Sequence, residues 1–410
     1  MRENSFRILL GLGVAGLIAG SLGMGVRLIL GHVPMAYGSY VPWGLWVAFD
    51  LLFLGLTAGA YIIVVLTYGF GLKQFESLVP LSVFSLLVSL LCEGIIISLD
   101  LGHPLRVYRF LVTPSFSSML TWLVVFIVAM WLIFIPFLYF LLREKLVLWS
   151  RDPGRKGRKI YKALALGRTE YSDADRERDR KIVRLLALVS IPVGFVFFAV
   201  PSAMFTDMLG RPHWSSAILP ISYMFASYLS GCALVTLLAS VYHPQEAVFG
   251  FLGRLLRGFL ILFLLIEFIQ IFFGYRTDNP VAVAALSLIT KGPNAWIFWG
   301  VHLLLGSIVP LYLLTARPRD ARAVAWAGFL IVITFVAVRY NAVVPELMAY
   351  DLEKRDLFFI HRRLSQAYVP NLYEWLVSLW VVSLGIVVFL LGTRWLPVTP
   401  AEKGGEQHAS

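Results

Sequence analysis

Stretches of about 20 mostly apolar residues recur along the whole sequence, and each is long enough to cross a bilayer as an α-helix. Lipid offers no partner for backbone hydrogen bonds, so such runs predict helices rather than irregular chain. The composition agrees, because 59% of the residues are hydrophobic and only 14% are charged, whereas soluble proteins are less apolar. The expected spans cover residues 6–30, 44–70, 80–101, 118–142, 182–206, 216–240, 255–274, 294–315, 322–341 and 373–395.

These spans predict an all-α fold, a polytopic membrane helical bundle of about ten transmembrane helices. The integral membrane domain is expected to cover residues 1–397, and the polar residues 398–410 are expected to form a disordered cytoplasmic tail. A weak internal repeat adds detail, because the span with Glu93 and the span with Glu267 both end in arginine-containing sequence. We therefore predict two four-helix bundles, from spans two to five and six to nine, plus two peripheral helices.

Lysine and arginine gather in alternate loops, which is the positive-inside pattern of membrane proteins. The large basic loop 143–184 is therefore predicted to be cytoplasmic, and loop 342–372 is predicted to lie outside. This orientation places both termini in the cytoplasm and the chain in the cytoplasmic membrane as a multi-pass protein. The formal net charge of +11 then reflects topology rather than nucleic-acid binding. Loop 143–184 is either a solvated cytoplasmic loop or a docking surface for a cytoplasmic partner. Loop 342–372 is either a lid or a surface for a partner protein.

The cysteine and histidine content argues against a resident metal centre. The two cysteines, Cys92 and Cys232, both fall within expected spans, whereas an iron–sulfur cluster usually takes four thiolates. No zinc or iron spacing pattern occurs, and among the seven histidines only His302 falls in the middle of an expected span, so we expect no intrinsic haem, iron–sulfur cluster or other metal. An outer-face haem stays open as an alternative, because His32, His103 and His213 lie near the outer ends of three spans. A redox role would therefore need a mobile electron carrier and a partner protein. The lipid-soluble carrier within a bilayer is a quinone.

Ionisable residues cluster at the end of the third expected span, where charged groups are costly and usually functional. Glu93 and Asp100 are seven residues apart, so they share one helix face about 10 Å apart along the axis. Asp100 and His103 are the predicted proton acceptors. Arg106 would polarise a quinone oxygen or hold Asp100 in an ion pair. Asp50, about two turns into the second span, joins Glu93 as a second-line relay residue.

Aromatic and polar residues at the same membrane face complete a predicted quinone slot. A quinone ring needs an apolar slot, polar groups at its two oxygens, and an acid or imidazole to take protons. The predicted lining is His32, Tyr37, Tyr40, Trp43 and Tyr108. An alternative stays open, because aromatic residues also anchor helices at the membrane interface. Intramembrane acids likewise form structural pairs, such as Glu267 with Arg276 or Arg339.

Several motifs resemble the NrfD/PsrC family of membrane subunits, which includes the membrane subunit of polysulfide reductase. The most specific pair is Pro42-Trp-Gly-Leu-Trp-Val-Ala-Phe-Asp50 with Ser98-Leu-Asp-Leu-Gly-His-Pro-Leu-Arg106. Further matching segments are 298–311, 338–345 and 368–375. The ten expected spans are similar to the HybB-like and DsrP-like branch of the family. The resemblance implies a cofactor-free subunit that exchanges electrons between menaquinol or menaquinone and an outer-face iron–sulfur partner.

The resemblance also implies partners and a metabolic setting. The expected partner is a ferredoxin-like iron–sulfur subunit, joined in DsrP-like complexes by a membrane haem b subunit, a multihaem cytochrome and a cytoplasmic iron–sulfur subunit. The chain would then be a non-autonomous subunit of a quinol oxidoreductase in sulfur- or sulfate-type anaerobic energy metabolism. The family's quinone pocket near the outer face would include His32, Asp100, His103 and Arg106. One position departs from HybB-like members, because His302 replaces their glutamate, and a proton route there would be altered.

Two other function classes fit the same sequence. A secondary transporter also has about ten spans, intramembrane charges and repeats, and it binds its solute near the bilayer midplane. A purely structural membrane anchor would need the spans but would leave Glu93 and Asp100 without a role. Transport of a solute by the chain alone would favour the first, and complex activity without quinone binding to the chain would favour the second.

Overall fold

The computed structural model describes residues 1–399 except 2, 209, 243–245 and 350–363. Most of the predicted tail, residues 400–410, lies outside the described residues. Part of the predicted loop 342–372, residues 350–363, does so as well. Within the described chain, ten helices are long and apolar enough to cross a membrane, which confirms the predicted fold class. They are α1 (Glu3–Leu30), α2 with η1 (Leu45–Val64, Val65–Gly69), η2 with α3 (Lys73–Leu78, Val79–Asp100), α5 (Met119–Arg151), α7 (Asp173–Thr206), α8 (Leu219–Tyr242), α9 (Glu246–Gly274), η4 with α11 (Ile297–Ile308, Val309–Ala316), α12 (Ala321–Met348) and α13 (Leu372–Trp395).

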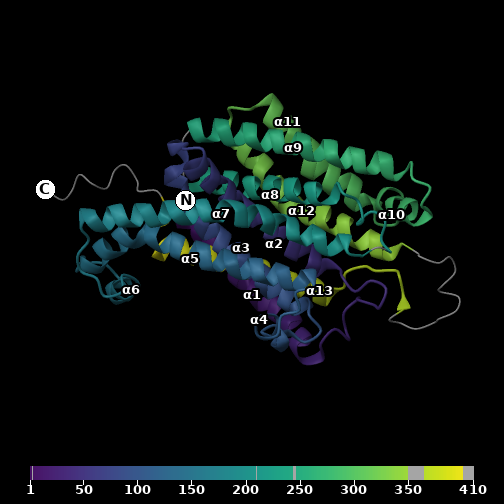
Figure 1. Cartoon of the computed structure of the whole chain (residues 1–410), viewed down its shortest axis with the longest axis horizontal. Helices are drawn as coiled ribbons and strands as arrows, with labels where there is room; N and C mark the ends of the chain where they lie inside the picture. Colours follow the sequence, from purple (N-terminus) through teal and green to yellow (C-terminus); the bar gives the residue numbers. More distant parts are fainter. Residues whose placement is uncertain (2, 209, 243–245, 350–363, 400–410) are drawn as a thin grey trace.

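The spanning helices form two rings of four, with one helix pair beside them. In the side view of Figure 1, α9 and α11 lie at the top of the bundle and α1 lies in its lower part. The first ring consists of α2, α3, α5 and α7, and each of these helices packs against its neighbours in the ring. The second ring consists of α8, α9, α12 and the η4–α11 helix. Helices α1 and α13 pack along each other, and α13 also packs against α3. This arrangement matches the two predicted bundles and two peripheral helices.

Close backbone contact between α2 and α8 joins the two rings. Gly59 of α2 faces Gly231 of α8, and a Cβ atom at Gly231 would lie 2.8 Å from the Gly55 carbonyl oxygen and nearer still to the Gly59 nitrogen. Only glycine lets the two backbones approach this closely, as is common between membrane helices. Helix α2 is buried along its whole length, because α3, α7, α8, α12 and α13 all pack against it.

The predicted loop 143–184 is largely helical, which differs from the sequence expectation. Helix α5 runs on to Arg151, α6 covers Arg158–Leu164, and α7 begins at Asp173 behind a Ser172 capping box. A buried pair, Arg143 Nε to Asp179 Oδ2 at 2.8 Å, ties the two long helices together beyond their apolar parts. Hydropathy marks where a helix leaves lipid, whereas capping residues and ion pairs decide where it ends.

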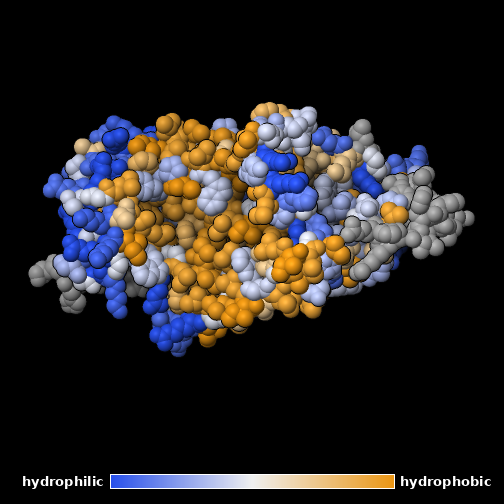
Figure 2. Space-filling view, turned by 90° about the horizontal axis from the view of Figure 1, so that it is seen from below, coloured by the Kyte–Doolittle hydropathy of each residue, from blue (hydrophilic) through white to orange (hydrophobic). Residues whose placement is uncertain are grey.

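The two ends of the bundle differ in polarity. Figure 2 shows a broad hydrophobic belt across the middle of one face, with hydrophilic residues gathered at the end that holds α6. We call the opposite end the outer end, after the predicted topology. It carries residues 31–44, 101–118, 207–208, 210–218 and 275–296, which include the short elements η3 (Pro104–Arg106), α4 (Arg109–Val112) and α10 (Pro280–Thr290). The candidate site residues gather at or below this end.

Candidate functional site

Three carboxylates, Asp50, Glu93 and Asp100, lie close together on α2 and α3. Asp50 on α2 is 5% exposed and Glu93 on α3 is fully buried, and Asp100 is the last residue of α3. Asp50 lies within electrostatic range of both other acids, so it stands between them. Among the described residues, neither Glu93 oxygen has a hydrogen-bond partner, nor has Oδ1 of Asp50 or Asp100. Buried carboxylates without partners are costly and suit a proton-handling role.

The cation beside Asp100 comes from α1. Arg27 is 2% exposed, and its Nε donates to the Leu99 carbonyl at 2.7 Å. Its charge acts directly on Asp100, and the Tyr37 hydroxyl hydrogen-bonds the same carboxylate. Arg106, the partner considered from the sequence, is exposed on η3. Among the described residues, the positive charge that acts on Asp100 is therefore that of Arg27, whose own hydrogen bonds go to backbone carbonyls.

An aromatic cluster closes the outer end above these acids. The His32 ring lies 5.6 Å from Tyr37 and 5.8 Å from Trp46, measured between centroids, and Tyr37 stacks on Tyr368 at 5.8 Å. The Tyr368 hydroxyl in turn donates to Glu374 of α13, whose Oε1 accepts from a backbone N–H of residues 31–44. Burial, reinforced by the Arg27 charge, lowers the pKa of His32, so its imidazole is neutral at neutral pH.

The remaining predicted residues take other places. His103, Arg106 and Tyr108 are exposed on the η3–α4 segment at the outer surface. Tyr40 is partly buried, and Trp43 packs edge-on against Phe205 at 5.5 Å. The structure thus brings Asp50, Glu93, Asp100, His32 and Tyr37 together, and it leaves the other five predicted residues at the surface or at the neighbouring loop. These five contribute no group to the buried acid cluster.

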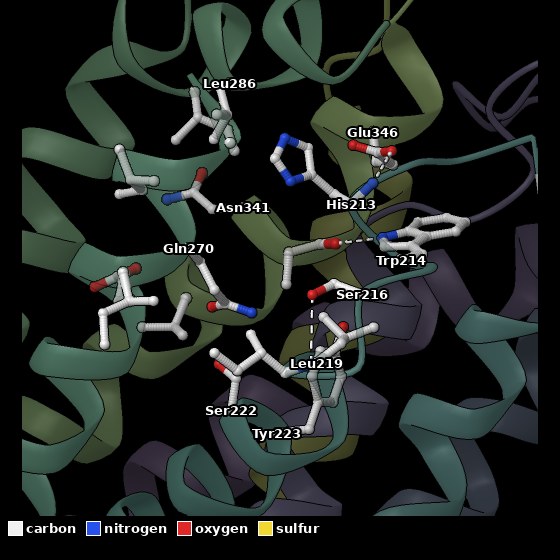
Figure 3. Close-up of a pocket in the computed structure, with 18 of the residues that line it drawn as sticks. His213, Trp214, Ser216, Leu219, Ser222, Tyr223, Gln270, Leu286, Asn341 and Glu346 are labelled. Atoms are coloured by element: carbon white, nitrogen blue, oxygen red, sulfur yellow. Dashed lines mark hydrogen bonds between the residues drawn. The ribbon is translucent and has the colours of Figure 1, made fainter. Parts of the chain in front are cut away.

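A cavity of about 550 Å³ lies in the second ring, below the outer end (Figure 3). Its walls come from residues 212–226, the last turns of α9, α10, η4 and the outer part of α12. The walls are largely apolar, and the rings of Trp214, Phe263 and Phe298 belong to them. In Figure 3 the labelled side chains of Gln270, His213 and Tyr223 lie around a central space. None of the residues predicted as site residues lines this cavity.

A Glu267–His302 pair crosses the cavity wall. Glu267 Oε1 lies 3.1 Å from His302 Nε2, and His302 is 1% exposed. The Asn341 amide donates to His302 Nδ1 at 3.4 Å, which leaves Nε2 as the proton-bearing atom facing the glutamate. The sequence suggested Arg276 or Arg339 as the partner of Glu267, and the structure assigns His302 instead. Helix η4 is π-helical here, a geometry frequent at functional sites.

Two further polar groups of the cavity are buried and incompletely paired. The Arg339 guanidinium is 2% exposed, and its Nη2 donates to Ser227 Oγ at 3.0 Å. Its Nε and the Tyr223 hydroxyl have no hydrogen-bond partner among the described residues. The Arg339 guanidinium carbon lies 5.3 Å from the Tyr223 ring centroid, so the two groups sit at the same part of the wall. Both line the cavity.

His213 and Glu346 stand at the outer rim of the cavity. The His213 backbone N–H donates to Glu346 Oε1 at 3.2 Å, and its ring Nε2 lies 3.0 Å from the Ala282 carbonyl oxygen. The carbonyl can only accept, so Nε2 carries the proton. Burial lowers the pKa of His213, which keeps the ring neutral. Figure 3 shows His213 and Glu346 on the same side of the space, joined by a dashed line.

Sequence reasoning missed three residues that the structure adds to the first site. Arg27 could have been found from the sequence, because it is a lone basic residue near the end of the first apolar run. Tyr368 and Glu374 lie in a segment that already resembled the family, but their spacing did not show what they contact. In the second ring, nothing in the local sequence joined Glu267 to His302, because 35 positions separate them.

Comparison with known proteins gives consistent matches over most of the chain. A selenate reductase subunit of Mesobacillus selenatarsenatis is 27% identical over 94% of this chain and 93% of its own length. The Hdr-like menaquinol oxidoreductase integral membrane subunit of Archaeoglobus fulgidus is 21% identical, with 88% of this chain and 86% of the relative covered. The menaquinone reductase integral membrane subunit of Nitratidesulfovibrio vulgaris is 20% identical, covering 88% and 84%.

The family signature itself covers residues 34–351 and is described as "Polysulphide reductase, NrfD". That range begins at residue 34, in the outer segment that also contains Tyr37, and therefore leaves out His32. It includes both helix rings and extends past the end of α12. The family expected from the sequence motifs is thereby confirmed, and the chain belongs to the NrfD family of polysulphide reductase membrane proteins.

Proposed function

We propose that this chain exchanges electrons and protons between a membrane quinone, of the menaquinone type, and an iron–sulfur partner protein at the outer face. The observation that carries the proposal is a line of three carboxylates, the buried Glu93 and Asp50 and the half-buried Asp100, which ends beside Tyr37 and Arg27. Two relatives named for menaquinol or menaquinone chemistry support the choice of carrier.

Oxidation of a quinol releases two electrons and two protons, so the site must handle both. In this proposal the quinol hydroxyl lies against Asp100, which accepts its proton, while Tyr37 holds the carboxylate in place. Arg27 offsets the negative charge when Asp100 is ionised. Asp50 and Glu93 offer further proton positions deeper in the ring, and the electrons leave through the partner. Reduction of a quinone runs the same steps backwards.

The exposed η3–α4 segment is the proposed contact with the partner. It presents His103, Arg106 and Tyr108 at the outer surface, directly after Asp100 in the chain. These residues then assist electron transfer by placing the partner over the Asp100 site, with His103 as a proton acceptor at the surface. A ferredoxin-like iron–sulfur protein fits this role. The proposal also includes further haem and iron–sulfur proteins in the complex. It places both termini of the chain in the cytoplasm and assigns the complex to sulfur-type respiration.

The test uses the purified chain and then the assembled complex. In a fluorescence-quench titration with a quinol-analogue inhibitor, wild type should bind saturably at Asp100, and Asp100→Asn should bind more weakly. Asp207→Asn is the matched control, since Asp207 is an exposed carboxylate at the same end. In the complex, loss of the proton acceptor should slow quinol-dependent electron transfer by about 100-fold or more. Wild-type turnover in an assembled Asp100→Asn complex would refute the assigned role.

A further inference from the structure

We propose that the cavity in the second ring is a second binding site, for the head group of another quinone molecule. The inference rests on the proposed function in one respect only, that the chain meets quinones in its membrane. It adds a site in a different helix ring, built from different residues. The Asp100 cluster belongs to α1–α3, whereas the cavity belongs to α8, α9, α10, η4 and α12.

The size and the walls of the cavity suit a flat aromatic ligand. Its volume of about 550 Å³ falls within the range of about 300–1,000 Å³ that small-molecule sites occupy. Aromatic rings of Trp214, Phe263 and Phe298 form part of the lining, with a few polar groups between them. This combination, apolar walls with few convergent polar atoms, is typical of sites for mostly apolar ligands.

The polar groups show where the oxygens of the ligand would bind. Arg339 and Tyr223 are both more than nine-tenths buried, and each directs an unpartnered donor at the cavity region. A buried donor without an acceptor is costly, and a ligand carbonyl would satisfy both donors at once. Gln270 also lines the cavity, and its amide can donate to or accept from a second oxygen.

The charge of the lining favours a neutral ligand over an anion. Arg339 brings one positive charge, but the carboxylates of Glu267 and Glu346 line the same cavity. An inorganic anion would therefore face two acidic side chains as well as Arg339, whereas a neutral diketone ring needs no net positive charge from the lining. His302 already pairs with Glu267 and gives no free cationic group.

The position of the cavity suits a ligand that arrives through lipid. Its wall includes the last turns of α9, and this helix also carries Phe268, which is 64% exposed and does not line the cavity. A wall helix with large apolar side chains on its outer face is one that a bilayer would cover. A quinone with an isoprenoid tail could therefore keep the tail in lipid while its ring enters the cavity.

The experiment measures how many quinones the full-length chain binds, and where. The chain is purified in detergent, saturated with a menaquinone analogue that carries a photoreactive azide, irradiated, digested and mapped by mass spectrometry. We expect two labelled regions, one near Asp100 and one within residues 213–226, 263–274, 298–302 or 338–346. Extraction of unreacted menaquinone should give two molecules per chain. Asp100→Asn should reduce only the first label.

The variants separate a binding role from a packing role. Tyr223→Phe removes one hydroxyl that bonds to nothing else described, so the fold should survive, and the second site should bind about three- to tenfold more weakly. Tyr228→Phe, on the same helix but away from the cavity lining, is the matched control and should bind like wild type. Arg339→Gln should weaken the second site further.

The results that would overturn the inference differ from those that would overturn the proposed function. Label confined to the Asp100 region with one quinone per chain would remove the second site and leave the proposed function standing. Equal binding by Tyr223→Phe and wild type at a labelled cavity would refute the assigned contacts. Label in the cavity alone would support this inference and refute the placement of quinol at Asp100.

Discussion

Substituting Gly231 by alanine should weaken the contact that holds the two helix rings together. The new Cβ atom would lie 2.8 Å from the Ala58 carbonyl carbon and from the Gly55 carbonyl oxygen, whereas ordinary contact begins at 3.4 Å. The backbones of α2 and α8 must therefore separate by more than about 0.6 Å, the difference of those two distances, because the Gly59 nitrogen lies nearer still. These neighbours are backbone atoms of a fully buried helix, so no flexible side chain can move aside.

The expected cost follows from two opposing effects. Overpacking of a close-packed interior costs about 1–3 kcal/mol, and a clash with backbone belongs at the upper end. Alanine in a helix gains up to about 1 kcal/mol over glycine. We therefore expect a net loss of roughly 2 kcal/mol for Gly231→Ala, and no loss for Gly258→Ala, whose Cβ would meet no atom within 4 Å.

The assay is thermal unfolding of the full-length protein, tagged with a fluorescent protein and followed by size-exclusion chromatography in detergent. Gly231→Ala should lose its monodisperse peak several degrees below wild type, because each kcal/mol shifts the midpoint by a few degrees at most in a chain this long. Gly258→Ala should melt with wild type or slightly above it. If the two alanine variants melt together, the close approach of α2 and α8 does not hold the rings together as argued.

Three further predictions use the same unfolding assay. Arg143→Ala leaves Asp179 buried without its cation and should lower the free energy of unfolding by about 3–5 kcal/mol. Lys181→Ala breaks an exposed pair and should lower it by less than about 0.5 kcal/mol. Equal losses of stability in the two variants would contradict the argument from burial. Because the pKa of His32 is lowered in the folded chain, the unfolded chain binds a proton first as the pH falls below the ordinary value of 6.5, and the stability of wild type should fall there. His32→Gln should reduce this dependence of stability on pH. An unchanged dependence would exclude His32 as its source. His302→Glu places a second carboxylate against the first and should be less stable than His302→Gln by roughly 1–3 kcal/mol, and the reverse order would show that the pair is not what holds this wall.

The membrane fold was open to prediction because its main signal is local. Each apolar run predicts a helix from its own residues alone, and all ten expected spans are helical in the described residues. The helix ends were less predictable. The charged stretch between the fourth and fifth spans was expected to be a loop, but ion pairs such as Arg143 with Asp179 extend both helices beyond the apolar parts.

The sequence by itself determined the number of spans, the family and which acids lie inside the membrane, since these depend on residue type and on spacing along one helix. Tertiary structure alone decided which groups meet. Arg27 reaches Asp100 only because the end of α1 lies beside the end of α3, and His302 reaches Glu267 only because η4 and α9 belong to the same ring. The cavity has the same origin, because its walls come from five segments that meet only when the second ring closes.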